Sequence, residues 1–229
     1  NAAGAGAVVF FPKGVYKITA TVNTVSGQRW TGTDMNMDAG TADVVIKSTF
    51  SGIAVNMLAS TLENLRIEGP GFSATNSVGI YIRASSATVR NVAVRHFGTG
   101  ISVLQLWYGH FDRVHTYFNS VGFKIEYSYN VLLNNVRISA DRGDGVATGG
   151  AIEGYNRGIL VPSDASLACF GTYFETKNGV NASGVLLDGV RANIILVGCQ
   201  VYISDHSAWV NVTQTAVGER ITGSGNKFK

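Results

Sequence analysis

Short apolar runs alternate with polar residues along the whole chain, and glycine, asparagine and serine separate one run from the next. A period of two is typical of β-strands that bury one face, and the 3.6-residue period of an amphipathic helix is almost absent. Two short apolar elements recur in the same order along the chain, which indicates an internal repeat built of strands.

The first element has the form glycine-apolar-x-apolar, and its six copies begin at Gly52, Gly79, Gly100, Gly122, Gly158 and Gly184. The second element follows 12 to 14 residues later each time, and its copies begin at Asn64, Asn91, Arg113, Asn135, Gly171 and Gly198. A third short strand precedes five of these copies, at Ala87, His110, Leu132, Ala168 and Ile195. Three strands in a repeat of about 21 to 27 residues describe one coil of a parallel β-helix.

The repeat therefore predicts an all-β fold, a right-handed single-stranded parallel β-helix of about seven to eight coils, with residues 1–229 as one domain. We expect the first coil to begin at Val8 and a less regular last coil near Trp209. The segment SADRGDGVATGGAIEGYNR interrupts the spacing after Ile138 and is predicted to be an insertion. A β-sandwich is the competing architecture, but it predicts no repeat in register.

Composition supports a β-structure and narrows the partners. Only 14% of the 229 residues are charged, while glycine occurs 28 times, which favours many tight turns. The net charge of +3 is too small to predict a nucleic-acid partner, and an acidic polysaccharide stays open. No apolar run is long enough for membrane insertion. Cys169 and Cys199 lie in no zinc or redox spacing, so we expect buried, reduced core residues.

The opening VVFFPKGVYKI, followed by QRWTG, has the pattern Val-x-Phe-x-Pro-x-Gly-x-Tyr, with Val8, Phe10, Pro12, Gly14 and Tyr16. Together with the glycine and asparagine elements, it resembles the pectate-lyase superfamily of right-handed β-helices, especially the branch of phage tailspikes and capsule depolymerases. The resemblance covers nearly the whole chain. It implies a homotrimer, in a virion tail or secreted, that binds and cleaves a bacterial surface polysaccharide of the capsular or O-antigen type.

Members of this superfamily usually carry a short helix that caps the first coil, and only NAAGAGA precedes that coil here. We therefore expect a fragment or processed form that lacks the N-terminal cap helix. Polygalacturonases of the superfamily carry Asn-Thr-Asp and Asp-Asp motifs, which do not occur in this sequence, so a plant-cell-wall pectinase is disfavoured. Pectate lyases surround calcium with acidic residues, and only Asp141-Arg-Gly-Asp144 is loosely similar. We predict no metal and no cofactor.

Alternate side chains of a strand point out of a β-helix, so the second element yields two outward rows. One row holds Arg66, Ala93, His115, Arg137, Tyr173 and Gln200, and the other holds Glu68, Arg95, Tyr117, Ser139, Glu175 and Tyr202. Guanidinium groups bind carboxylates in a fork and aromatic rings stack on sugars, so this ribbon is predicted to bind a polymeric sugar. A solvated sheet face is an equal alternative.

The insertion after Ile138 is predicted to bring acidic residues beside this ribbon, close to Arg137. Hydrolysis of a glycosidic bond needs one carboxyl group as acid and another as base or nucleophile. The catalytic candidates are therefore Glu175, Asp144, Asp141 and Glu153. A plain acidic surface loop is the structural alternative.

Other outward residues supply candidates for substrate binding. These are Arg137, His115, Tyr117, Tyr173, Arg95 and Trp107. In a lyase, which needs a base at C5 of a uronic acid, His115, Tyr117 or Arg137 would fill the reactive roles. Trp107 and Tyr108 are predicted to lie in a turn, as a sugar platform or a subunit contact.

Three further rows are predicted to be structural. Outward leucines of the first element, at Leu104, Leu160 and Leu186, would be covered by three chains around a common axis or by a loop that folds back. An internal amide ladder is expected from Asn64, Asn91 and Asn135, and a lateral ion-pair row from Glu63, Arg90 and Asp112.

The leading functional hypothesis is a tailspike-like depolymerase that acts as a glycoside hydrolase. A polysaccharide lyase on the same fold is the first alternative. A structural or adhesive virion protein that binds glycan without cleaving it is the second.

Overall fold

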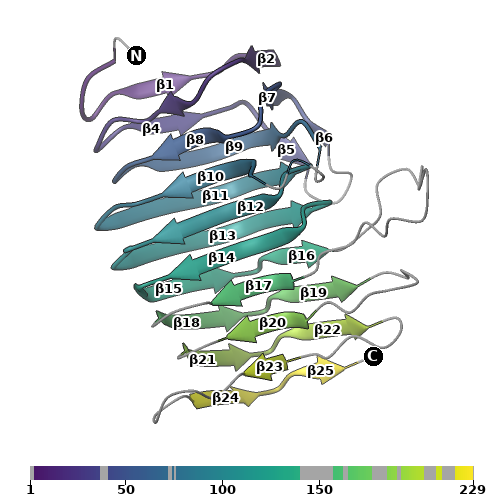
Figure 1. The fold of residues 1–229 in the computed structure, drawn as a ribbon. Coiled ribbons are helices and arrows are strands. Elements are labelled where there is room, and N and C mark those ends of the chain that lie inside the picture. Colours follow the sequence, from purple (N-terminus) through teal and green to yellow (C-terminus); the bar gives the residue numbers. More distant parts are fainter. Residues whose placement is uncertain are drawn as a thin grey trace, which may run out of the picture.

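The computed structural model describes residues 3–36, 41–71, 74, 76–139, 157–161, 165–176, 185–189, 192–203, 210–212 and 220–228. All regular structure in these ranges is β-strand, and the strands stack coil upon coil from the N-terminus to the C-terminus (Figure 1). Apart from one short hairpin, every pair of neighbouring strands is parallel. The prediction of an all-β parallel β-helix is therefore confirmed.

One wall of the stack, here called the first face, is an eight-stranded sheet. Its strands are β3 (Val22–Asn23), β8 (Ile53–Met57), β10 (Val78–Ile82), β12 (Thr99–Leu104), β14 (Val121–Glu126), β17 (Arg157–Val161), β20 (Val185–Gly189) and β23 (Val210–Val212). Each strand belongs to a different coil, so the sheet runs along the axis of the stack.

The other two walls form one 15-stranded sheet that bends along its length. Before the bend lies the second face, made by β1 (Val8–Phe10), β4 (Arg29–Thr31), the first halves of β9 (Thr61–Glu68), β11 (Ser86–Arg95) and β13 (Tyr108–Tyr117), and β15 (Ser128–Asn134), β18 (Ala165–Phe170), β21 (Ala192–Val197) and β24 (Arg220–Ser224). The expectation that the first coil begins at Val8 is confirmed.

After the bend lies the third face. It consists of β2 (Gly14–Ile18), β7 (Val44–Ser48), the second halves of β9, β11 and β13, and β16 (Arg137–Ser139), β19 (Tyr173–Thr176), β22 (Gln200–Ile203) and β25 (Lys227–Phe228). Between β4 and β7 the chain also forms an antiparallel hairpin of β5 (Met35–Asn36) and β6 (Thr41–Ala42).

The bend explains why asparagine and glycine begin the second element. Residues at this position have positive φ, between 50° and 66°, in seven successive coils: Asn64, Asn91, Arg113, Asn135, Gly171, Gly198 and Gly225. Glycine and asparagine adopt this left-handed conformation at least cost. The Asn91 side-chain amide also donates to Asn64 Oδ1 at 2.8 Å, which confirms the amide ladder for this pair.

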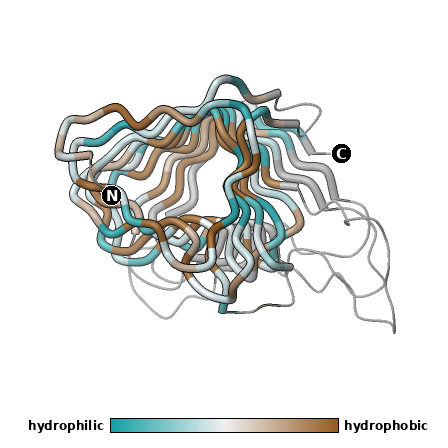
Figure 2. The backbone as a smooth tube through the Cα atoms, turned by 90° about the horizontal axis from the view of Figure 1, so that it is seen from above, coloured by the Kyte–Doolittle hydropathy of each residue, from teal (hydrophilic) through white to brown (hydrophobic). Residues whose placement is uncertain are grey.

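Inward side chains form one apolar column inside the stack, and Figure 2 looks down its axis. Phe111 and Phe123 are fully buried and meet edge to face, with ring centroids 5.5 Å apart. Cys169 and Cys199 are buried free thiols in the same core, as predicted. Burial raises the pKa of both thiols.

The register of the first element differs from the prediction at two copies. Ile53 and Val55 pair with Val78 and Ile80, so Ala54, rather than Gly52, lies opposite Gly79. Arg157 and Ile159 pair with Val185 and Leu187, so Leu186, rather than Gly184, lies opposite Gly158. A shift of two residues preserves the inward and outward alternation, so the apolar pattern alone cannot reveal it.

This shift changes the predicted row of outward leucines. Leu160 lies between Lys124 and Asp188, and Lys124 follows Ser102. The row of Leu160 is therefore largely polar. Leu186 instead continues the column of glycines, which consists of Gly79, Gly100, Gly122 and Gly158.

Candidate functional site

The two outward rows predicted for the third face are in register. The first runs in the order Arg66, Ala93, His115, Arg137, Tyr173 and Gln200, and the second in the order Glu68, Arg95, Tyr117, Ser139, Glu175 and Tyr202. Each residue is the parallel partner of the next, so the predicted register of both rows is confirmed.

A compact ion-pair cluster occupies the upper part of the third face. Glu68 accepts a hydrogen bond from Arg95 at 2.8 Å and pairs with Lys47 at 3.2 Å and Arg66 at 3.5 Å. Burial alone would raise the pKa of Glu68, but the hydrogen bonds and charges of Arg95 and Lys47 outweigh it and leave that pKa below its ordinary value. The cluster thus pairs three basic side chains with Glu68 and connects neighbouring strands of this face.

Below this cluster, the face is covered. His115 and Tyr117 are each 6% exposed, and their ring centroids lie 4.4 Å apart. Met35 of β5 packs against Tyr117 and Ala93, with Ala42 of β6 beside them. His115 and Tyr117 are therefore buried although they point outward, and the hairpin lies over Tyr117.

The other residues predicted on the third face are described to different extents. Arg137 is half-buried, and its guanidinium lies 5.4 Å from the ring centroid of Tyr173. Glu175 lies on β19 as the partner of Ser139, while its side chain is outside what the structure describes. Asp141, Asp144 and Glu153 all lie outside the described residues.

Aromatic side chains gather at the turn between the first and second faces. Exposed fractions are 57% for Trp107, 67% for Tyr108, 54% for Tyr127 and 39% for Tyr129. Trp107 and Tyr129 come from successive coils, and their ring centroids lie 5.5 Å apart with planes inclined by 32°. We call these four residues the aromatic corner. Trp107, Tyr127 and Tyr129, together with Arg83, border a hollow of about 530 Å³.

The backbone of this turn explains why the rings point outward. Leu106 is fully buried, and its N–H donates to Ser128 Oγ at 3.1 Å. The N–H of Tyr129 donates to the Leu106 carbonyl at 2.8 Å. Because Leu106 and Ser128 tie the two turns together on the inside, the residues that follow them are directed to the surface.

A shallow groove of about 410 Å³ lies beside the corner on the second face. Tyr108 borders it, and the outward row that forms its floor contains Thr61, Thr88, His110 and Leu132. Its lining comes from five successive coils, so it runs along the axis for about 19 Å at the usual strand spacing. We call it the axial groove.

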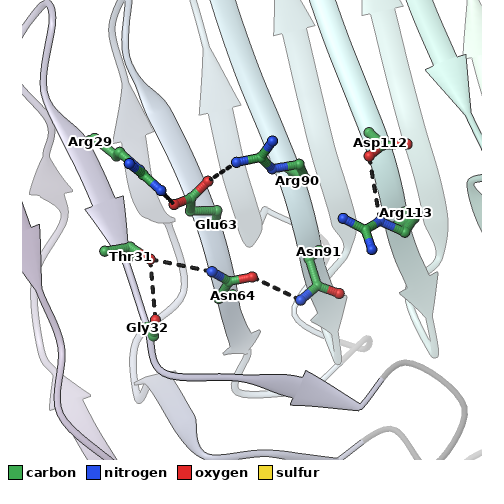
Figure 3. Close-up of polar contacts among 9 residues, drawn as sticks. All are labelled: Arg29, Thr31, Gly32, Glu63, Asn64, Arg90, Asn91, Asp112 and Arg113. Atoms are coloured by element: carbon green, nitrogen blue, oxygen red, sulfur yellow. Dashed lines mark hydrogen bonds and ion pairs between the residues drawn. The ribbon is translucent and has the colours of Figure 1, made fainter.

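A polar ladder, drawn in Figure 3, lies close to this groove, because Glu63 and Arg90 follow the lining residues Thr61 and Thr88 by two positions. The carboxylate of Glu63 is fully buried and bonds to Arg29 Nε at 2.6 Å and to Arg90 Nη2 at 2.7 Å. One coil beyond Arg90, Asp112 pairs with Arg113 at 3.4 Å. The predicted lateral ion-pair row is confirmed for Glu63 and Arg90.

Burial by itself would raise the pKa of Glu63. Hydrogen bonds and charges from Arg90 and Arg29 outweigh burial and hold the pKa of this carboxyl below its ordinary value. Glu63 is therefore ionised in the folded chain at neutral pH and fixes both guanidinium groups beside the groove.

Sequence reasoning selected Trp107 but grouped it with residues of another face. Trp107 precedes β13, whereas Tyr117 ends that strand beyond the bend. Tyr127 and Tyr129 were missed. The signal was present, because SVLQLWY and KIEYSY end successive strands of the first face with aromatic residues in the same turn.

No cluster of three or more His, Cys, Asp or Glu side chains suited to a metal ion occurs among the residues that the structure describes. In the same residues, there is no helix with the length and apolar character to span a membrane.

The model of the right-handed β-helix region matches residues 51–228, so the chain belongs to the right-handed β-helix family. A comparison with curated protein sequences finds no significant match. The handedness expected from the sequence resemblance agrees with this family.

Among solved structures, the chain is similar to ORF18 of Geobacillus virus E2, with 16% identity and a TM-score of 0.58 over 96% of this chain and 53% of that chain. It thus spans about half the length of the viral protein. Tailspike protein 2 of Escherichia coli O157:H7 bacteriophage CAB120 is 10% identical, with a TM-score of 0.46 over 82% of this chain and 31% of that chain. An alginate lyase of Paenibacillus sp. is 13% identical, with a TM-score of 0.45, over 99% and 90% of the two chains. The likeness to the viral protein shows the fold alone.

Proposed function

We propose that the chain binds a bacterial surface polysaccharide, capsular or O-antigen, in the axial groove and on the aromatic corner. The observation that carries this proposal is the position of four exposed aromatic rings beside a polar groove that crosses five coils. Aromatic rings offer apolar faces to sugar rings, and the hydroxyl and imidazole groups of Thr61, Thr88 and His110 offer hydrogen bonds to sugar hydroxyls.

The rigidity of the site also favours a polymer. The groove is built on strands whose positions are fixed by backbone bonds to the coils on either side. A rigid surface loses little conformational entropy when a long, repetitive ligand lies along it. Exposed aromatic rings cost solubility, so a binding role gives them a reason.

A panel of purified capsular and O-antigen polysaccharides tests this proposal by affinity electrophoresis and calorimetry. We expect Trp107→Ala to weaken the affinity for the polymer by about tenfold or more. An aromatic anchor that the ligand buries contributes at least about 1.4 kcal/mol to binding. Tyr81→Ala, on the first face, is the matched control and is expected to bind as the unchanged protein does. Binding of no polymer, or full binding by Trp107→Ala, contradicts the proposal.

Cleavage of the polymer is the finer part of the proposal. Glu175 with Asp144, Asp141 or Glu153 would supply the acid and the base or nucleophile of a glycoside hydrolase. The support is the register of Glu175 with Ser139, because Asp141 follows only two residues further along the chain. Glu175 and Ser139 belong to the third face, whereas the axial groove lies on the second face. Binding and cleavage therefore require separate assays.

New reducing ends measure hydrolysis, and the ultraviolet absorbance of an unsaturated uronate identifies a lyase. Glu175→Gln and Asp144→Asn are expected to abolish hydrolysis and to leave groove binding intact. Polymer that is bound for a day without new ends or absorbance favours the non-catalytic alternative, a glycan-binding virion protein. Unchanged hydrolysis in both variants removes these two residues from the catalytic role.

A homotrimer in a virion tail, or in a secreted protein, is the setting that we propose for this activity. Light scattering at micromolar concentration gives the mass directly, with three chains expected. A monomer under these conditions contradicts the trimer and leaves the binding proposal untouched.

A further inference from the structure

Arg29 and Arg90 lie next to residues that line the axial groove, and Figure 3 shows both side chains on Glu63. Arg29 is the parallel partner of Thr61, so it stands in the row that forms the groove floor. Arg90 follows the floor residue Thr88 by two positions on β11, which places it on the same side of the sheet, about 7 Å from Thr88 along the strand. Both guanidinium groups can therefore reach a ligand in the groove.

The charges of the ladder do not cancel. Arg29, Arg90 and Arg113 face Glu63 and Asp112, which leaves one net positive charge. The exposure is also unequal, since the Glu63 side chain is 0% exposed while those of Arg29 and Arg90 are 53% and 46% exposed. The ladder thus presents cationic groups to solvent beside the groove, while the carboxylate that pairs with them is buried.

The two arginines also have N–H donors that Glu63 does not use. Arg90 contacts Glu63 through Nη2, and Arg29 does so through Nε and Nη2. In the part of the chain that the structure describes, Arg90 Nε and Nη1 and Arg29 Nη1 have no hydrogen-bond partner. Because Glu63 holds both side chains in place, the remaining N–H groups are oriented before any ligand arrives.

A structural ion-pair row alone needs neither feature. One arginine would neutralise Glu63, and a second adds a charge that stability does not require. The remaining guanidinium N–H groups carry positive charge and can donate to a carboxylate or phosphate, an anionic acceptor that a neutral sugar lacks.

From this arrangement we infer that the polysaccharide bound in the axial groove is acidic, and that Arg29 and Arg90 bind the carboxylate of one of its sugar units. This inference rests on the proposed binding at the groove and adds the class of polymer and the residues that select it. The aromatic corner provides affinity for sugar rings in general, and the arginine pair distinguishes acidic from neutral chains.

The test uses the polymer that the chain selects from a panel of acidic and neutral capsular polysaccharides. That polymer is compared with its carboxyl-reduced form and, where it carries phosphate, with its dephosphorylated form. We expect an acidic polymer whose affinity falls about tenfold on carboxyl reduction. Arg90→Gln should cause a similar loss of affinity for the native polymer and almost none for the reduced one. The affinity of Arg90→Lys for the native polymer should lie between those of the unchanged protein and Arg90→Gln.

Controls separate this inference from the proposed function. Lys124→Gln removes a positive charge from the first face and is expected to leave binding unchanged. Thermal unfolding checks that each variant is folded, and Arg29→Gln provides a second, independent variant. Selection of a neutral polymer, a loss on dephosphorylation alone, or full binding by both arginine variants overturns the inference. The proposed function survives these outcomes as long as Trp107→Ala still weakens binding.

Discussion

The rings of Trp107 and Tyr129 lie 5.5 Å apart although they belong to different coils. Trp107 is also 57% exposed, whereas Trp30 is buried in the apolar core. In a variant with Trp30→Phe and Trp209→Phe, we expect the fluorescence of Trp107 to be red-shifted and easily quenched by acrylamide. Addition of the selected polysaccharide should shift the emission to the blue and protect it from the quencher. Unchanged emission at saturating polymer would show that Trp107 lies outside the bound surface.

The buried carboxylate of Glu63 predicts a dependence of stability on pH. Because its pKa is lower in the folded chain than its ordinary value, its contribution is present above about pH 4.3 and is lost as the pH falls through the lower folded pKa. Glu63→Gln should cost about 1 to 3 kcal/mol of unfolding free energy at neutral pH and much less in acid. Urea denaturation at several pH values measures this difference.

Asp43→Asn is the control for that prediction. Asp43 pairs with Lys13 at 2.9 Å, but both side chains are well exposed, so the change should cost less than about 1 kcal/mol. Equal effects of the two substitutions would mean that the burial of Glu63 adds nothing to its ion pairs.

The bend position of Asn91 predicts a backbone effect. With φ at 54°, Asn91→Gly keeps the conformation and loses only the side-chain bond to Asn64. Asn91→Val places a β-branched residue in the left-handed region and should cost about 1 to 3 kcal/mol more than the glycine variant. Chemical denaturation compares the two, and equal stabilities would show that the bend does not impose this conformation.

The column of glycines on the first face predicts a steric effect. A Cβ at Gly100 would lie 2.8 Å from the Gly122 carbonyl oxygen and 2.9 Å from Asn119 Nδ2. Asn119 receives the N–H of Phe97, so Gly100→Ala should displace this contact and cost about 1 to 3 kcal/mol. Gly4→Ala, with no atom within 4 Å, is expected to have almost no effect on the melting temperature.

Two phenylalanines on the second face, one on β13 and one on β18, separate core from surface. Phe111 is fully buried, and Phe111→Ala should cost about 3 to 5 kcal/mol because it leaves a cavity beside Phe123. Phe170 points outward and is 38% exposed, so Phe170→Ala should cost less than about 1 kcal/mol. Similar losses in denaturation experiments would contradict the assignment of inward and outward positions.

The sequence determined the coil. Alternation with a period of two sets which side chains face inward, and asparagine and glycine at Asn64, Asn91 and Gly171 set where the sheet bends. These are local preferences of each residue and its neighbours, so they can be read along the chain without knowing what packs where. The two outward rows of the third face followed correctly from them.

Tertiary structure decided which of the outward residues meet solvent and which meet each other. Tyr117 is outward by its position on the strand, yet the hairpin around Met35 covers it. A two-residue shift moved Leu186 into the column of glycines without disturbing the alternation. Exposure and register depend on segments far away in the sequence, so no local pattern contains them. For the same reason, the aromatic corner and the arginine pair beside the groove exist only where successive coils stack.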